Sequence, residues 1–157
     1  MNNHNDWFLS LKLEVLSLVS LLQMLKEDMI IMLTMSEWVI EDVSVGESFK
    51  KLQQILTKSH QDLEYFVREI KRIEQGSFFS VVDLKDEFDY IHDSIYLELD
   101  YMNHIADYLL QSNQIGISKR HTKVKYLNEE ERYLEQIESN QQQLKHLRKE
   151  RRENYFE

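Results

Sequence analysis

The chain has 157 residues, a formal net charge of −9, no cysteine, no proline and only three glycines. Its 42% hydrophobic content argues against wholesale disorder, and its length fits one domain with a substantial core. The lack of cysteine excludes disulfides and thiolate metal sites, and the acidic balance argues against general binding of nucleic acid.

The start of the chain carries no Lys or Arg before Lys12 and no small-residue cleavage site, so we expect no secretory signal. The longest strictly apolar run, residues 29–33, is far shorter than the roughly 20 residues that span a bilayer. From these two observations we expect a cytoplasmic protein.

Few helix breakers interrupt the chain, which predicts long helices. Gly46, Gly76 and Gly116 stand where the helical apolar pattern stops, as glycine does at helix C-termini. The four predicted helices cover about residues 5–44, 47–75, 81–112 and 119–153. We therefore expect an all-α fold in which residues 1–157 form a single domain, an antiparallel bundle of about four long helices.

The first segment is apolar on most of its sides, with one helical stripe that begins at Trp7 and another that begins at Leu9. Such a helix is either central in the bundle or shared with another chain. Its polar residues are mostly acidic, which argues against a helix that lies on a membrane surface. The sequence does not decide whether the helix breaks near residues 26–28, so residues 5–44 form either one helix or two.

The second and third segments have clear helix starts. Ser44 with Glu47, and Ser80 with Asp83, are spaced as capping boxes. Apolar side chains then follow one face of each segment at helical spacing, within an arc of about 100° in the second segment.

The fourth segment predicts a coiled-coil-like helix with a narrow apolar stripe. Two series repeat every seven residues, and their members are Leu127, Leu134, Gln141 and Glu130, Ile137, Leu144. The basic residues within 145–152 are interleaved with acids, which favours a solvated helix end over a nucleic-acid or lipid site.

No motif for catalysis or metal binding is present. No Glu is followed three residues later by His, as the di-iron bundle motif requires, and no nucleophile elbow or phosphate loop occurs. The i,i+4 pairs His60–Glu64 and Asp100–His104 are typical of surface ion pairs. We expect no catalytic residue, no metal and no cofactor, with a metal-binding bundle enzyme or carrier as a remaining alternative.

The outer face of the third segment is the most informative surface. Its acidic residues lie within an arc of about 60°, opposite the apolar face, and tyrosines run beside them. The candidate partner-binding residues are Asp86, Asp89, Asp93, Asp100, His104, Asp107, Tyr90, Tyr101 and Tyr108. Such a stripe suits a partner protein with a basic surface, although a merely solvated face gives the same pattern.

These features predict a non-enzymatic protein that binds another protein through helical surfaces, as a regulator, an adaptor or an inhibitor of the immunity type. The alternative is a self-assembling structural protein, in which the first and fourth segments form a homo-oligomeric interface. We expect neither nucleic acid nor a membrane as the partner.

Overall fold

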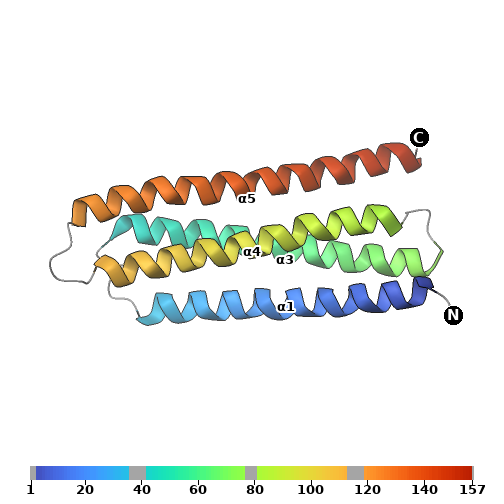
Figure 1. Ribbon diagram of the computed structural model, residues 1–157, viewed down its shortest axis with the longest axis horizontal. Helices are drawn as coiled ribbons and strands as arrows, with labels where there is room; N and C mark the ends of the chain where they lie inside the picture. Colours follow the sequence, from blue (N-terminus) through green and yellow to red (C-terminus); the bar gives the residue numbers. More distant parts are fainter. Residues whose placement is uncertain (1–2, 36–41, 77–80, 113–118, 157) are drawn as a thin grey trace.

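The computed structural model describes residues 3–35, 42–76, 81–112 and 119–156, and in these ranges the chain forms four helices and no strand. The helices are α1 (Asn3–Met35), α3 (Val43–Glu74), α4 (Val81–Ser112) and α5 (Lys119–Phe156). Each contains 32 to 38 residues and is therefore a rod of roughly 50 Å. The expected all-α bundle is confirmed, and Figure 1 shows its helices along one common direction.

Successive helices run antiparallel. Lys12, near the start of α1, forms an ion pair with Glu74 at the end of α3. Arg148, near the end of α5, lies 2.8 Å from Glu87 near the start of α4. The order is therefore up-down-up-down, which short connections allow.

The four helices do not form a square. α3 and α4 make a central pair, α1 lies on one side of this pair, and α5 lies on the other (Figure 1). The most extensive contacts between helices are those of α4 with α5 and of α3 with α4, and α1 packs against both members of the central pair. As a result α3 and α4 are covered on two sides, while α1 and α5 each keep an outer face.

The apolar core lies mainly between α1 and the central pair. α1 directs one or two side chains per turn into it, namely Leu11, Val15, Leu18, Leu22, Leu25 and Met29. Large buried residues such as Phe66 of α3 and Ile95 of α4 complete this core. Among the described residues, α5 adds only three buried apolar side chains, Tyr126, Ile137 and Leu144. The contact of α5 with the bundle must therefore rest largely on polar groups.

The start of α3 differs from the prediction. Asp42 is the N-cap, and its carboxylate accepts the Ser44 amide at 3.0 Å. The capping box at Ser44 and Glu47 is therefore wrong, because Asp42 already satisfies the first turn. Gly46 lies inside this first turn and does not end a helix.

The other helix ends are closer to expectation. α1 runs to Met35 and passes through residues 26–28 without the break considered there. Val43 and Ser44 already belong to α3, so the predicted helix 5–44 is too long, and residues 36–41 lie outside the described part of the chain. Gly76 follows α3 with a φ of +92°, a left-handed conformation that glycine adopts easily. Gly116 and the second capping box, at Ser80, lie outside the described residues.

Candidate functional site

Charged and hydroxyl side chains fill the space between the central pair and α5. We call them the buried polar layer, and its members are Ser48, Ser59, Asp62, Glu69, Glu87, Glu98, Tyr101, Tyr126, Glu130, Arg148 and Arg151. Burial of such groups is costly unless each finds a partner, so the pairing within the layer decides whether it holds α5 in place.

Glu130 of α5 is the centre of one half of the layer. Its carboxylate accepts hydrogen bonds from Tyr101 at 2.7 Å and from Ser48, and Tyr126 donates to the Ser48 hydroxyl at 2.6 Å. Lys51 adds a positive charge 3.7 Å away. Burial, together with this carboxylate, raises the pKa of Tyr101 and Tyr126, so both phenols remain donors. This cluster joins α3, α4 and α5.

An aromatic stack continues this half of the layer. The Tyr126 ring lies between His104 and Tyr108, with centroids 4.7 and 4.1 Å away. His104 donates from Nε2 to the Tyr126 carbonyl at 2.9 Å, and Tyr108 donates to Asp42 at 2.7 Å. Burial would raise the pKa of Asp42, but the bond from Tyr108, the charge of Lys123 and the amide bonds lower it. The N-cap of α3 is thereby tied to α4.

Two arginines of α5 hold the other half of the layer. Arg148 lies 2.8 Å from both Asp62 of α3 and Glu87 of α4. Arg151 lies 2.6 Å from Glu87 and 3.7 Å from Glu69, and its side chain is only 2% exposed. The expectation of a solvated basic helix end is therefore wrong for these two residues. Helical spacing could have identified both, because Arg148 and Arg151 follow Leu144 by four and seven residues and therefore share its face of α5.

Glu98 is the most unusual carboxyl group of the layer. It is fully buried, and the Ser59 hydroxyl donates to it. Burial raises the pKa of Glu98 to about 8, an effect that the negative charge of Asp62 increases further. At neutral pH this side chain is consequently a neutral acid, so its burial does not require a counter-charge.

The layer has the composition of a metal or acid–base site but a different arrangement. In the described part of the chain, no three His, Asp or Glu side chains are grouped so that they could hold a metal ion. Arginines and hydroxyls occupy the positions between the carboxylates. The layer is thus suited to fixing the position of α5 on the central pair.

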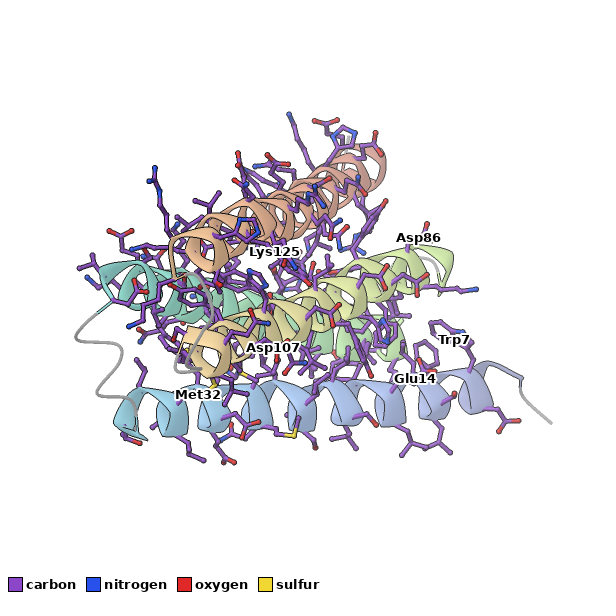
Figure 2. The ribbon with its side chains drawn as sticks, turned by 60° about the vertical axis from the view of Figure 1, so that its left-hand side comes forward. Trp7, Glu14, Met32, Asp86, Asp107 and Lys125 are labelled. Atoms are coloured by element: carbon purple, nitrogen blue, oxygen red, sulfur yellow. The ribbon has the colours of Figure 1, made fainter. Side chains whose placement is uncertain are left out.

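The predicted partner-binding stripe of α4 divides into two parts. The exposed members are Asp86, Asp89, Asp93, Asp100 and Asp107, and Figure 2 shows Asp86 and Asp107 toward opposite ends of α4. Tyr90 is half-buried. Tyr101 and Tyr108 are buried, and the His104 side chain is only 9% exposed. The expectation that these last three share the exposed stripe is wrong, because α5 covers their edge of α4.

Of the two i,i+4 pairs, only one forms. His60 lies 2.8 Å from Glu64 on the surface of α3. His104 instead lies 3.5 Å from Glu129 of α5, because its ring turns toward Tyr126 and away from Asp100.

The two heptad series of α5 differ in burial. Glu130, Ile137 and Leu144 are buried, whereas Leu127 is 39% exposed. Leu134 and Gln141 are half-buried. The buried seam of α5 therefore follows the series Glu130, Ile137 and Leu144. An apolar pattern alone would not favour this series, because it contains a carboxylate.

A second candidate site lies on the opposite side of the molecule. α1 exposes eight large apolar side chains, most of them on the sides away from the central pair, and we call them the α1 outer face: Leu9, Leu13, Leu16, Val19, Met24, Ile30, Ile31 and Leu33. Figure 2 shows side chains on this side of α1 projecting away from the bundle. Gln23 and Glu27 interrupt the apolar surface, and the Gln23 amide donates to Glu27 at 3.1 Å.

Over Asp6–Thr34, α1 is long enough and apolar enough to cross a membrane, judged by length and composition alone. Unbroken apolar runs do not reveal this property, because single charged residues interrupt the segment. The stretch without charge between Glu14 and Lys26 is residues 15–25, which is about 16 Å against the roughly 30 Å of bilayer hydrocarbon. In addition, the inner side of α1 packs into the apolar core of the bundle. Both observations argue against α1 as a membrane span in this fold.

Two grooves flank α1. The groove toward α3 has a volume of about 330 Å³, and the groove toward α4 has about 570 Å³. The second is bordered by Glu14 and Asp89, so the α4 side of α1 is acidic. Lys26 and Arg68 border the first, so the α3 side carries positive charge.

Comparison of the chain with known protein families, with curated proteins and with solved structures gives no match. The function is therefore argued from these two sites alone.

The Glu98→Gln variant is expected to be more stable than the wild type at pH 8 and about equally stable near pH 4. Between about pH 4.5 and 8, unfolded Glu98 ionises while the folded group stays protonated, so rising pH favours unfolding of the wild type. At about 1.4 kcal/mol for each pKa unit, the difference should reach roughly 3–5 kcal/mol. Urea unfolding from pH 4 to 9 measures it, and parallel curves for the two proteins would contradict the protonated buried state.

The Arg151→Met variant is expected to lose about 3–5 kcal/mol of unfolding free energy, because Glu69 and Glu87 stay buried without one of their counter-charges. Arg152→Met is the matched control. The Arg152 side chain is exposed, so its substitution should change the free energy of unfolding by less than about 0.5 kcal/mol. Equal unfolding midpoints for both variants in urea would show that the arginine contacts do not stabilise α5.

Proposed function

We propose that this protein is a non-enzymatic binding module that regulates, links or inhibits another protein held on the α1 outer face. One observation carries the proposal: α1 gives one side to the core and still exposes eight large apolar residues, most of them on its other sides. An amphipathic helix in a complete bundle needs only one apolar side.

The extent of the exposed surface supports a protein interface. The eight side chains are between 38% and 61% exposed. With about 100 Å² of apolar surface on each large aliphatic side chain, the exposed total is on the order of 400 Å². This is the size of the largest apolar patch on a typical monomer, about 300–600 Å², which is often functional, and it would supply about half of the roughly 800 Å² that each partner contributes to a standard interface.

Charge indicates the chemistry of the partner. Glu27 lies exposed within the apolar surface, and Glu14 and Asp89 border it on the α4 side. The net charge of −9 adds attraction for a basic surface at long range. The partner that fits best is an amphipathic helix with an apolar ridge and lysines or arginines beside it.

A second copy of the chain is the alternative that one observation favours. Leu9, Leu13 and Leu16 are spaced by four and three, as in a coiled-coil seam, although the next positions of the series, Ser20, Gln23 and Glu27, are polar. In a parallel pair, however, Glu27 would face its own copy, which costs free energy. An anionic bilayer fits less well, because the flanking acids would be repelled by it.

The double variant Leu13→Glu, Leu16→Glu is expected to abolish partner binding without loss of helicity, since both side chains are more than half exposed. The matched control is Val124→Glu, Leu127→Glu, which places two acids on exposed apolar positions of α5. Affinity capture from the native lysate with mass spectrometry and light scattering compares the three proteins. Recovery of the same stoichiometric partner by all three would contradict the proposal. A wild-type dimer that becomes a monomer only in the α1 variant would favour self-assembly.

Charge reversal at Asp93 and Asp100 tests the acidic stripe. Both side chains are exposed and border one groove between α4 and α5. The Asp93→Lys, Asp100→Lys variant is expected to weaken partner binding by less than about tenfold, through loss of long-range attraction, because both aspartates lie toward α5 and do not border the α1 outer face. The effect should shrink at high salt. Unchanged affinity at low salt, measured by calorimetry with the captured partner, would restrict the interface to α1.

A further inference from the structure

The groove between α1 and α3 has the lining of a small-molecule site. Its volume of about 330 Å³ is at the lower end of the range for ligand pockets. Buried Leu22 and Leu63 form its floor, and Val19 and Val67 line it beside them. Such a surface favours an apolar ligand body, because covering it removes apolar area from water.

The rim of the groove supplies positive charge. Lys26 comes from α1 and Arg68 from α3, and neither has an ion pair with any residue that the structure describes. The other two ionisable rim residues, His60 and Glu64, lie 2.8 Å apart and bind each other. The two cations of the rim therefore outnumber its single carboxylate, Glu64, and neither of them is paired with it.

The register of the two helices separates these cations. The ion pair between Lys12 and Glu74 aligns α1 with α3 in opposite directions. In this register Arg68 lies level with residue 18 of α1, eight residues from Lys26, which is a separation of about 12 Å along the helix. The apolar floor lies between them, so one cation is near each end of the groove.

We propose that the α1–α3 groove binds a small amphipathic anion, such as a medium-length fatty acid or an aryl sulfonate. The apolar body lies on Leu22 and Leu63, and the anionic group pairs with Lys26 or Arg68. The net charge of −9 opposes an anion at long range, but salt screens this repulsion beyond about 10 Å. Contacts at the groove therefore decide the affinity.

The groove on the other side of α1 provides the contrast. It is larger, at about 570 Å³, but Glu14 and Asp89 border it together with the single cation Lys85. An anion there would be repelled by two carboxylates. An anionic ligand therefore favours the smaller α1–α3 groove, because the sign of the rim charge matters more than the groove volume.

The test uses 1-anilinonaphthalene-8-sulfonate as the probe, because it combines an apolar ring system with one anionic group. Fluorescence titration is expected to show saturable binding to the wild type, competed by dodecanoate. The Lys26→Glu, Arg68→Glu variant should bind at least tenfold more weakly. Lys85→Glu is the matched control, because it reverses a rim charge at the other groove, and its affinity should stay within twofold. The uncharged analogue N-phenyl-1-naphthylamine should bind weakly and equally to all of these proteins.

Circular dichroism and thermal unfolding establish that each variant keeps its fold before titration. Absence of probe binding to the wild type would overturn the proposal. Equal affinity of the wild type and the Lys26→Glu, Arg68→Glu variant would overturn it too. Probe binding that is lost in Leu13→Glu, Leu16→Glu but kept in the charge-reversed groove would assign the probe to the α1 outer face and also reject the groove.

Discussion

The structure depends on the two-sided burial of the α3–α4 pair. Both helices are covered by α1 on one side and by α5 on the other, so each must satisfy two different neighbours (Figure 1). Toward α1 they offer apolar side chains, and toward α5 they offer the buried polar layer. Apolar contacts depend little on direction, whereas hydrogen bonds and ion pairs require defined geometry. The polar layer therefore specifies the register of α5, much as a buried polar residue specifies register in a coiled coil.

This division explains why the outer surfaces of the two flanking helices differ. α5 is polar on most of its circumference, because even its inward face carries Glu130, Arg148 and Arg151. α1 is apolar on most of its circumference, and only part of that surface is covered by the central pair. The bundle is complete on the α5 side and incomplete on the α1 side. A partner that buries apolar area consequently gains most free energy at α1.

The sequence predicts the helices well but not the faces that they bury. Absence of proline and a period near 3.6 are local properties, and the predicted helix at 81–112 coincides with the described extent of α4. The predicted stripe of α4 depends on one apolar face opposite one solvent-exposed face. α4 has two covered sides, so Tyr101 and Tyr108 are buried although they border an acidic surface. Glu98 and Arg151 have the spacing of buried residues, since Glu98 follows Ile91 by seven and Arg151 follows Leu144 by seven, but their charge favours the surface and their burial depends on partners distant in sequence.

The two edges of the α1 outer face carry opposite charge, and this has a consequence for specificity. Glu14 and Asp89 border the α4 side, whereas Lys26 and Arg68 border the α3 side. A partner helix with bases along one edge can therefore lie on α1 in one orientation more favourably than in the other. Val19 belongs both to the outer face and to the α1–α3 groove, so the two sites adjoin. An anion in that groove would neutralise the positive edge and change the affinity for the partner. By reciprocity, the partner would change the affinity for the anion by the same factor.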